Sequence, residues 1–109
     1  MAFDEGLAQR VREYFQEHTI AEEKRMFGGL GFLLNGNMCV GVMGDEIVVR
    51  VGPPNYDAAL ALPFSRAFDF TGRAMKGWVL VAAEGLAEDQ ELHAWLMRGE
   101  QFASALPPK

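Results

Sequence analysis

The segment Arg73-Ala74-Met75-Lys76-Gly77-Trp78 carries the residue types in this sequence that are best suited to binding. It places two cations, a flexible thioether and an indole within six residues. Arg and Trp are enriched at the centres of binding interfaces, and Met adapts to irregular partner surfaces. Gly72 and Gly77 flank the segment and allow the backbone to turn sharply at both ends. The sequence therefore predicts a binding surface where one strand leads into the next.

Two alternatives stay open for this segment. In the first, Arg50 joins the loop cations to bind a small anion between sheet and loop, because guanidinium and ammonium groups pair with phosphate and carboxylate. In the second the segment is structural: its apolar side chains cap the core, and its cations solubilise the loop by pairing with Asp69 or Asp45. The candidate partner- or ligand-binding residues are Arg50, Arg73, Met75, Lys76 and Trp78.

The nucleophiles and bases of the sequence are not arranged for covalent catalysis, which needs a nucleophile, a nearby base and an orienting group. The single cysteine, Cys39, lies inside an apolar strand and is expected to be buried and structural. His18 falls at the end of one predicted helix and His93 on the polar side of another. These positions predict a protein that is not an enzyme, with an enzyme of unrecognised type as the remaining hypothesis.

Metal and cofactor patterns give the same expectation. No two pairs of His, Cys or carboxylate residues stand at metal-ligand spacing. The acidic run Glu88-Asp89-x-Glu91 opens a helix, where negative charge suits the helix dipole. Gly28-Gly29-Leu30-Gly31 would need a further glycine at Leu34, with a strand before and a helix after, to bind a dinucleotide. We expect no metal and no cofactor.

Hydrophobic periodicity predicts the elements that position these residues. Apolar residues over 4–18 repeat at helical spacing behind Asp4, a suitable N-cap. Asn35-Gly36 between apolar runs 26–34 and 38–43 indicates a hairpin with a type I′ turn, and 47–51 is a third, β-branched strand.

The second half of the chain follows the same logic. Asn55 can cap a short helix that Pro63 ends, and strands are expected over 67–70 and 78–82. Residues 92–106 show the clearest amphipathic helix. The order αβββαββα predicts a single α+β domain over residues 1–109, with a mainly antiparallel sheet of five strands and flanking helices.

Charge and composition narrow the class of protein. The 109 residues are 50% hydrophobic, which excludes a disordered chain, and they carry a net charge of −5. No apolar run reaches the length of a membrane span, and Asp4 and Glu5 stand where a signal peptide would be basic. Because an acidic chain releases few counterions from a phosphate backbone, we expect no independent binding to duplex DNA. We also expect a cytoplasmic protein that does not associate with membranes.

Three strings of residues together resemble the N-terminal domain of the TfoX/Sxy family, which is named for regulators of natural competence. They are Met26-Phe27-Gly28-Gly29, Asn35-Gly36-Asn37-Met38 and Arg73-Ala74-Met75-Lys76-Gly77-Trp78. The resemblance covers nearly the whole chain and implies an α-β(3)-α-β(2)-α fold like that of secretion chaperones. It offers no catalytic residues to transfer. The signature residues Met26, Phe27, Gly28, Gly29, Asn35 and Gly36 are expected to be structural.

The resemblance also shapes the expected function. Competence regulators of this family carry a second, helical domain, and this chain ends at Lys109, so a stand-alone N-terminal domain is expected. We expect a small regulatory or adaptor domain, related to transcription co-regulators, that acts through contacts with a protein partner. We also expect a homodimer, because open sheet edges need covering, with Met43, Phe64 and Trp78 as candidate interface residues.

Overall fold

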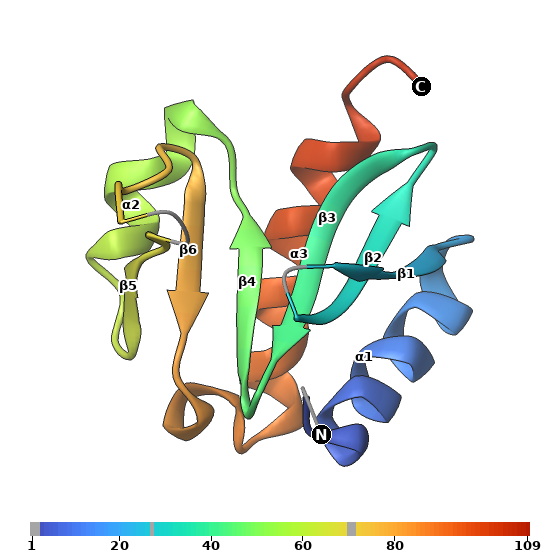
Figure 1. Ribbon diagram of the computed structural model, residues 1–109, viewed down its shortest axis with the longest axis horizontal. Coiled ribbons are helices and arrows are strands. Elements are labelled where there is room, and N and C mark those ends of the chain that lie inside the picture. The colour runs from blue at the N-terminus through green and yellow to red at the C-terminus, as the bar shows by residue number, and fades with distance from the viewer. Residues whose placement is uncertain (1–2, 27, 70–71) are drawn as a thin grey trace.

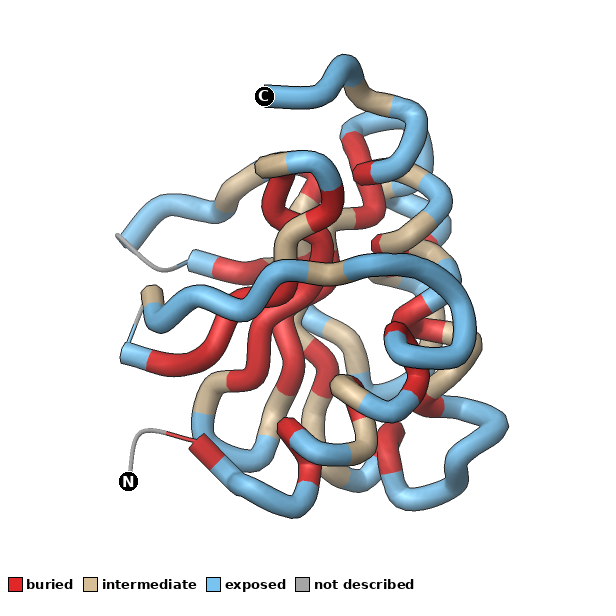
Figure 2. Tube along the Cα trace, turned by 90° about the vertical axis from the view of Figure 1, so that its right-hand side faces the viewer, coloured by how far each residue is buried: buried red, intermediate tan, exposed pale blue. Residues whose placement is uncertain are grey.

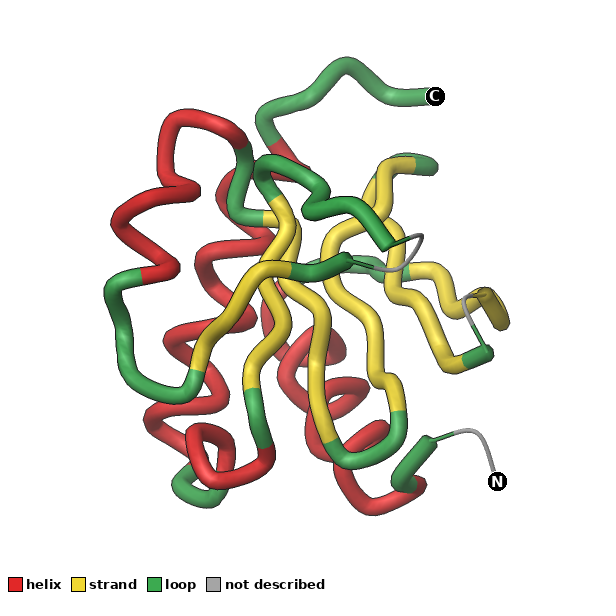
Figure 3. The backbone as a smooth tube through the Cα atoms, turned by 60° about the vertical axis from the view of Figure 1, so that its left-hand side comes forward, coloured by secondary structure: helices red, strands yellow, loops and turns green. Residues whose placement is uncertain are grey.

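In a computed structural model that describes residues 3–26, 28–69 and 72–109, the helices lie on one side of a single antiparallel sheet (Figures 1 and 3). The six strands follow the spatial order β1-β2-β3-β4-β6-β5. The elements in chain order are α1 (Glu5–His18), β1 (Glu22–Met26), β2 (Gly29–Leu34), β3 (Asn37–Met43), β4 (Glu46–Arg50), η1 (Pro53–Asn55), α2 (Tyr56–Leu60), β5 (Ser65–Ala67), β6 (Trp78–Val81), η2 (Ala83–Leu86) and α3 (Asp89–Ser104). The predicted α+β class and the order of helices and strands are confirmed.

The first helix begins where the sequence predicts. The Asp4 carboxylate accepts a hydrogen bond from the Leu7 amide at 3.1 Å, which satisfies one of the free N–H groups at the helix start. At the other end, His18 Nδ1 lies 2.6 Å from the Tyr14 carbonyl oxygen, and its ring stacks on the Tyr14 ring. His18 therefore closes the helix by local contacts.

Turn chemistry fixes the hairpin between β2 and β3. Asn35 and Gly36 have φ angles of 53° and 83°, as a type I′ turn requires, and Leu34 pairs directly with Asn37. Farther along the pair, a Cβ on Gly29 would lie 2.2 Å from the Val42 carbonyl oxygen. Glycine at this position therefore lets the two strands approach closely.

One strand is additional to the prediction. The sheet has β1 before the predicted meander, so it contains six strands where the periodicity predicted five. The β1 sequence Glu-Glu-Lys-Arg-Met is almost wholly exposed and lacks alternating apolar residues. Its backbone pairs with β2, and charges on an edge strand discourage pairing with another chain. Because its side chains do not alternate between buried and exposed, such a strand cannot be predicted from hydrophobic periodicity.

Two local predictions around α2 and β5 need correction. Asn55 precedes α2, but its side chain makes no capping bond; the amide donates instead to the Val51 carbonyl oxygen at 3.2 Å. The predicted strand 67–70 lies earlier, at β5, and Phe70 falls outside the described residues. Phe64 has a φ of 67°, so the chain turns there and β5 begins immediately after it.

The core lies between the sheet and the helices, and buried residues are concentrated on the strands and on the inner sides of the helices (Figure 2). Helix α3 packs tightly against β3 at Gly99, where a Cβ would lie 2.8 Å from Val40 Cγ1. Leu92 and Leu96 are completely buried on the same face of α3. This pattern confirms the amphipathic helix that the sequence predicts.

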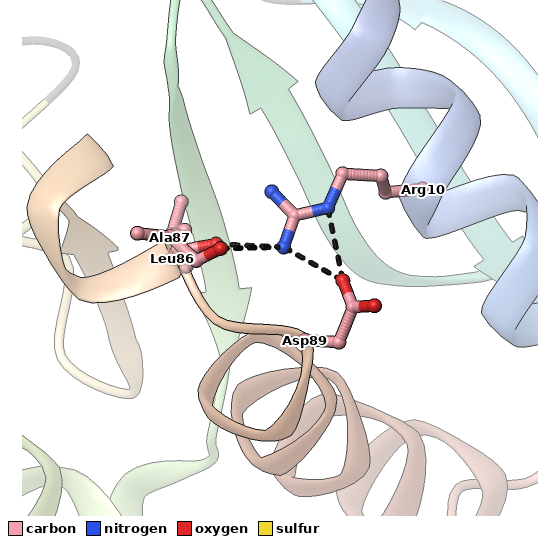
Figure 4. A network of polar contacts seen from close by, with 4 residues as sticks. All are labelled: Arg10, Leu86, Ala87 and Asp89. Atoms are coloured by element: carbon pink, nitrogen blue, oxygen red, sulfur yellow. Dashed lines mark hydrogen bonds and ion pairs between the residues drawn. The ribbon is translucent and has the colours of Figure 1, made fainter.

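Helices α1 and α3 are joined by polar contacts at their edges. Arg10 on α1 donates to the carbonyl oxygens of Leu86 and Ala87 at 2.8 and 3.4 Å and pairs with Asp89 at 3.0 Å (Figure 4). One turn along α1, the Tyr14 hydroxyl donates to Glu100 at 2.7 Å. These bonds fix α3 beside α1.

The segment after α3 returns to the β2–β3 turn. The Lys109 amide donates to the Asn35 carbonyl oxygen at 2.8 Å, and the Asn37 side chain donates to the Pro107 carbonyl oxygen at 3.0 Å. Asn37 is only 3% exposed and would otherwise bury an unpaired amide. The tail therefore satisfies a polar group inside the hairpin.

No helix within the described residues is long and apolar enough to cross a membrane.

Candidate functional site

Two of the predicted binding residues meet at one end of the sheet. Arg50, the last residue of β4, pairs in register with Trp78, the first residue of β6. The Arg50 guanidinium carbon lies 5.2 Å from the centroid of the Trp78 ring and 5.3 Å from that of Phe102 on α3. Both distances fall in the range of cation–π attraction. We call Arg50, Trp78 and Phe102 the aromatic-arginine cluster.

Backbone geometry just beyond β4 creates the space for this cluster. The amides of Val51 and Gly52 both donate to the Gly77 carbonyl oxygen, at 2.9 and 3.0 Å, which ties the end of β4 to the start of β6. Gly52 has a φ of 88°, and a Cβ there would lie 2.3 Å from the Phe102 ring. Only glycine allows this ring to lie against the backbone, and the ring thereby reaches Arg50.

The charge of Arg50 has no acidic partner in the part of the chain that the structure describes. Its Nη1 makes one long hydrogen bond, of 3.4 Å, to the Met38 carbonyl oxygen. The three ion pairs described involve other arginines: Arg10 with Asp89, Arg12 with Glu23, and Arg66 with Glu46. A guanidinium has five N–H donors, so half-buried Arg50 keeps most of its donor capacity for an external acceptor.

The loop before β6 places the other predicted residues beside Trp78. Met75 is half-buried; its amide donates to the Phe68 carbonyl oxygen at 2.9 Å, and its own carbonyl oxygen accepts from the Trp78 amide at 3.0 Å. Arg73 and Lys76 are exposed, and no ion pair with Asp69 or Asp45 is described for them. The structure thus unites Arg50 with Trp78, keeps Met75 next to Trp78, and leaves the loop cations in solvent.

The residues of the predicted family signature lie at two turns of the sheet. Met26, Gly28 and Gly29 surround the β1–β2 turn, and Asn35 and Gly36 form the β2–β3 turn. Phe27 lies outside the described residues. Their described roles are backbone roles: positive φ at Gly28, Asn35 and Gly36, and close strand approach at Gly29.

The side chains that could support catalysis or metal binding are not arranged with one another for either chemistry within the described residues. Cys39 is fully buried beneath α3, and burial raises the pKa of its thiol, so the reactive thiolate is disfavoured. His18 and His93 both pack on the ring of Tyr14, at centroid distances of 4.0 and 5.1 Å. Burial, together with the hydrogen bond to Glu100, raises the pKa of Tyr14. Within the described residues, no group of three or more His, Cys, Asp or Glu side chains could hold a metal ion.

The sequence missed Phe102 as a member of the cluster. Phe102 fitted the apolar repeat of the last helix, so the periodicity assigned it to the core. It is half-buried and lies over Gly52. The available signal was Gly52-Pro53-Pro54, a strand end that leaves room for an aromatic ring, but nothing local specifies which ring fills that room.

Comparison with known proteins gives one positive result. The sequence model of the family described as the TfoX N-terminal domain matches residues 13–103, which run from within α1 to within α3. No curated protein and no solved structure matches the chain.

Proposed function

The chain belongs to the TfoX N-terminal domain family, and from this premise we propose that it is a small non-enzymatic regulatory or adaptor domain that binds a protein partner. The family takes its name from regulators of competence, and a role as a cytoplasmic transcription co-regulator is part of the proposal. The observation that carries it is the aromatic-arginine cluster, a half-buried cation between two rings with no acidic partner in the described chain.

The cluster suits a protein surface that offers a carboxylate beside an apolar side chain. Arginine, tryptophan and phenylalanine supply both a bidentate donor and apolar area, a combination common at the centres of protein interfaces. The exposed cations Arg73 and Lys76 extend the positive surface beyond Trp78. We infer a partner whose contacting surface is acidic around an apolar centre.

A small-anion site remains the alternative, and the cavities favour it less. Five cavities are described among residues 3–26, 28–69 and 72–109, and none of the five is lined by Arg50, Arg73 or Lys76. Small ligands are usually enclosed in pockets of roughly 300–1,000 Å³. A half-buried cation on aromatic rings that lines none of these cavities therefore suits a protein surface better than an enclosed anion.

The test is quantitative capture of partners from a lysate of the source cells, with wild type and Arg50→Gln compared. We expect the specific partner to fall at least fivefold in the variant, because Gln cannot bind a carboxylate bidentately. Arg25→Gln is the matched control, since Arg25 also stacks on a ring, at 5.5 Å from the Phe3 centroid, but lies far along the sheet on β1.

Identical partner sets for wild type and Arg50→Gln would contradict the proposal. Tight binding of the isolated protein to duplex DNA, with a steep salt dependence, would contradict its reliance on protein contacts. Melting temperatures of all variants establish that losses of binding are not losses of fold.

A further inference from the structure

Helix α3 presents a second stripe of residues that neither the sheet nor α1 covers. Positions 91, 94, 98, 101 and 105 recur at three- and four-residue spacing, so they share one side of the helix. This side faces α2 and the loop after it, and two hollows lie between them. We call this surface the α2–α3 groove.

The two hollows lie in line along α3. The larger, of about 540 Å³, is lined by Arg98, Gln101 and Phe102 on α3 and by Ala105 just after it, and across from them by α2 and the residues on either side of it. The smaller, of about 140 Å³, is lined on α3 by Glu91, Ala94, Trp95 and Arg98, and across from them by the 62–64 loop. Leu62 and Arg98 belong to both hollows and form the saddle between them.

The spacing of the hollows matches the repeat of an α-helix. Their α3 linings are displaced by seven residues, which at about 1.5 Å per residue is about 10 Å. Side chains at positions i and i+7 of a helix lying along α3 are separated by the same distance. The groove therefore has two receptacles at the spacing with which an amphipathic helix presents its apolar anchors.

Arg98 supplies a charge at the point between the two anchors. Its guanidinium carbon lies 4.6 Å from the centroid of the Trp95 ring, and no ion pair is described for it. A carboxylate three or four positions after the first anchor of a bound helix would lie near this saddle. Arg98 thus specifies an acidic residue between the two apolar ones.

Phe64 at the rim of the smaller hollow is a second, independent sign of a contact surface. Its ring is half in solvent, with 52% of the residue exposed, and its backbone has a φ of 67°, which bulky residues rarely adopt. The Ala82 amide holds the turn by donating to the Phe64 carbonyl oxygen at 2.9 Å. A Cβ on Gly85 would lie 2.9 Å from Phe64 Cβ, so Gly85 makes room for this placement. Strained residues of this kind cluster at functional surfaces.

We propose that the α2–α3 groove binds an amphipathic helix of a protein partner, one that carries large apolar residues at i and i+7 and an acidic residue at i+3 or i+4. The proposal rests on the proposed function in one respect, that the domain works through protein contacts. Phe102 links the two surfaces, since it belongs to the aromatic-arginine cluster and also lines the larger hollow. The partner helix would therefore end beside Arg50.

The experiment is a selection from a displayed library of helical peptides against the full chain, followed by affinity measurement for the enriched peptides. Ala58→Trp fills the larger hollow from the exposed side of α2, and Arg98→Glu reverses the charge at the saddle. Ala61→Trp and Met97→Glu are the matched controls, because both residues are exposed and line neither hollow.

We expect enriched peptides to share apolar residues at i and i+7 with an acidic residue between them. Ala58→Trp and Arg98→Glu should each weaken them at least tenfold, and the controls less than twofold. A selection repeated on Arg98→Glu should replace the acidic residue with Lys or Arg. Absence of the i, i+7 pattern, or equal binding to groove variants and controls, would overturn the proposal.

Two further results would also overturn the proposal. A change in the solution mass of the protein on Ala58→Trp would identify a second copy of the chain in the groove. Loss of captured lysate partners with Arg50→Gln, but not with Ala58→Trp or Arg98→Glu, would leave the proposed function standing and remove the groove from it.

Discussion

Helix α3 contacts α1 along one side and faces α2 along the other, and the two sides are built differently. On the α1 side Arg10 binds Asp89 and the Leu86 carbonyl oxygen (Figure 4). The Tyr14 hydroxyl on the same side binds Glu100. On the α2 side Arg98 makes no described hydrogen bond or ion pair, and two hollows separate the elements.

We interpret this difference as a division of roles between the two sides of α3, one for stability and one for binding. Polar groups that are paired inside the molecule add stability and have little capacity left for a ligand, whereas unpaired cations beside open hollows keep their binding capacity. Arg50 and Arg98 are alike in this respect, because both lie on aromatic rings and neither has a described acidic partner. The α1 side should therefore govern stability, and the α2 side should govern binding.

The largest expected effect comes from removing the aromatic ring at the centre of the α1 side. Tyr14 is 2% exposed, contacts both histidines and binds Glu100, so Tyr14→Ala should cost about 3 kcal/mol or more of unfolding free energy. Chemical denaturation measures this loss. Leu62→Ala on the α2 side is the comparison and should cost far less, because Leu62 is only half-buried. Equal losses would remove the distinction between the two sides.

A smaller effect is expected at the Arg10 network. Arg10→Gln removes the bonds to Asp89 and to the Leu86 carbonyl oxygen, and should lower the unfolding free energy by about 1 kcal/mol. Arg10→Lys should recover only part of this, because an ammonium group cannot reach both acceptors as a planar fork does. Full recovery with Lys would show that charge alone holds α3 beside α1.

The contact of α1 with β1 should give a pH dependence of stability. Two bonds from Arg12, one of them 2.9 Å long, hold the pKa of Glu23 below its usual value. The stabilisation is present above the unfolded pKa of about 4.3 and is lost as pH falls through the lower folded pKa. Glu23→Gln should therefore cost at most about 1 kcal/mol at pH 7.

Denaturation midpoints measured between pH 2 and 7 test this prediction. The curves of wild type and Glu23→Gln should converge at the acid end. A gap that stays constant with pH would show that the ion pair is not its origin.

The smallest effect on stability is expected at Arg98. Arg98→Gln removes a charge that is not paired within the described chain, so the unfolding free energy should change by no more than about 0.5 kcal/mol. Arg10→Gln is the matched substitution on the opposite side of α3. A cost at Arg98 equal to that at Arg10 would mean that the α2 side is also held by its arginine.

Local sequence rules predicted much of the fold. Asp4 caps α1, Asn35 and Gly36 form the type I′ turn, and the apolar repeat of α3 faces the sheet. The cap and the turn depend on interactions between residues close in the chain, and the helix repeat depends on burial of one side. Both kinds of cause leave a pattern in the sequence. β1 could not be predicted in this way, because its charged side chains show no hydrophobic periodicity and its pairing with β2 is made by backbone groups.

The candidate site was predictable only in part. The side-chain types of Arg50 and Trp78 mark them as candidates, and both lie at ends of strands that the sequence indicates. Phe102 could not be assigned to them, because it lies 52 positions after Arg50 in the chain. The pairing of Arg10 with Asp89 and the contact of His93 with Tyr14 were likewise beyond local patterns.

The sequence by itself determined the α+β class, the order of helices and strands and the β2–β3 turn, since each is encoded in periodicity or in short-range residue order. Only the tertiary structure decided which cations are paired and which stay available. That choice depends on how α3 lies between α1 and α2, which the close approach of Gly99 to β3 and the ring of Phe102 over Gly52 set. Charge counts along a chain do not contain distances, and the function of an arginine depends on the distance to its nearest acid.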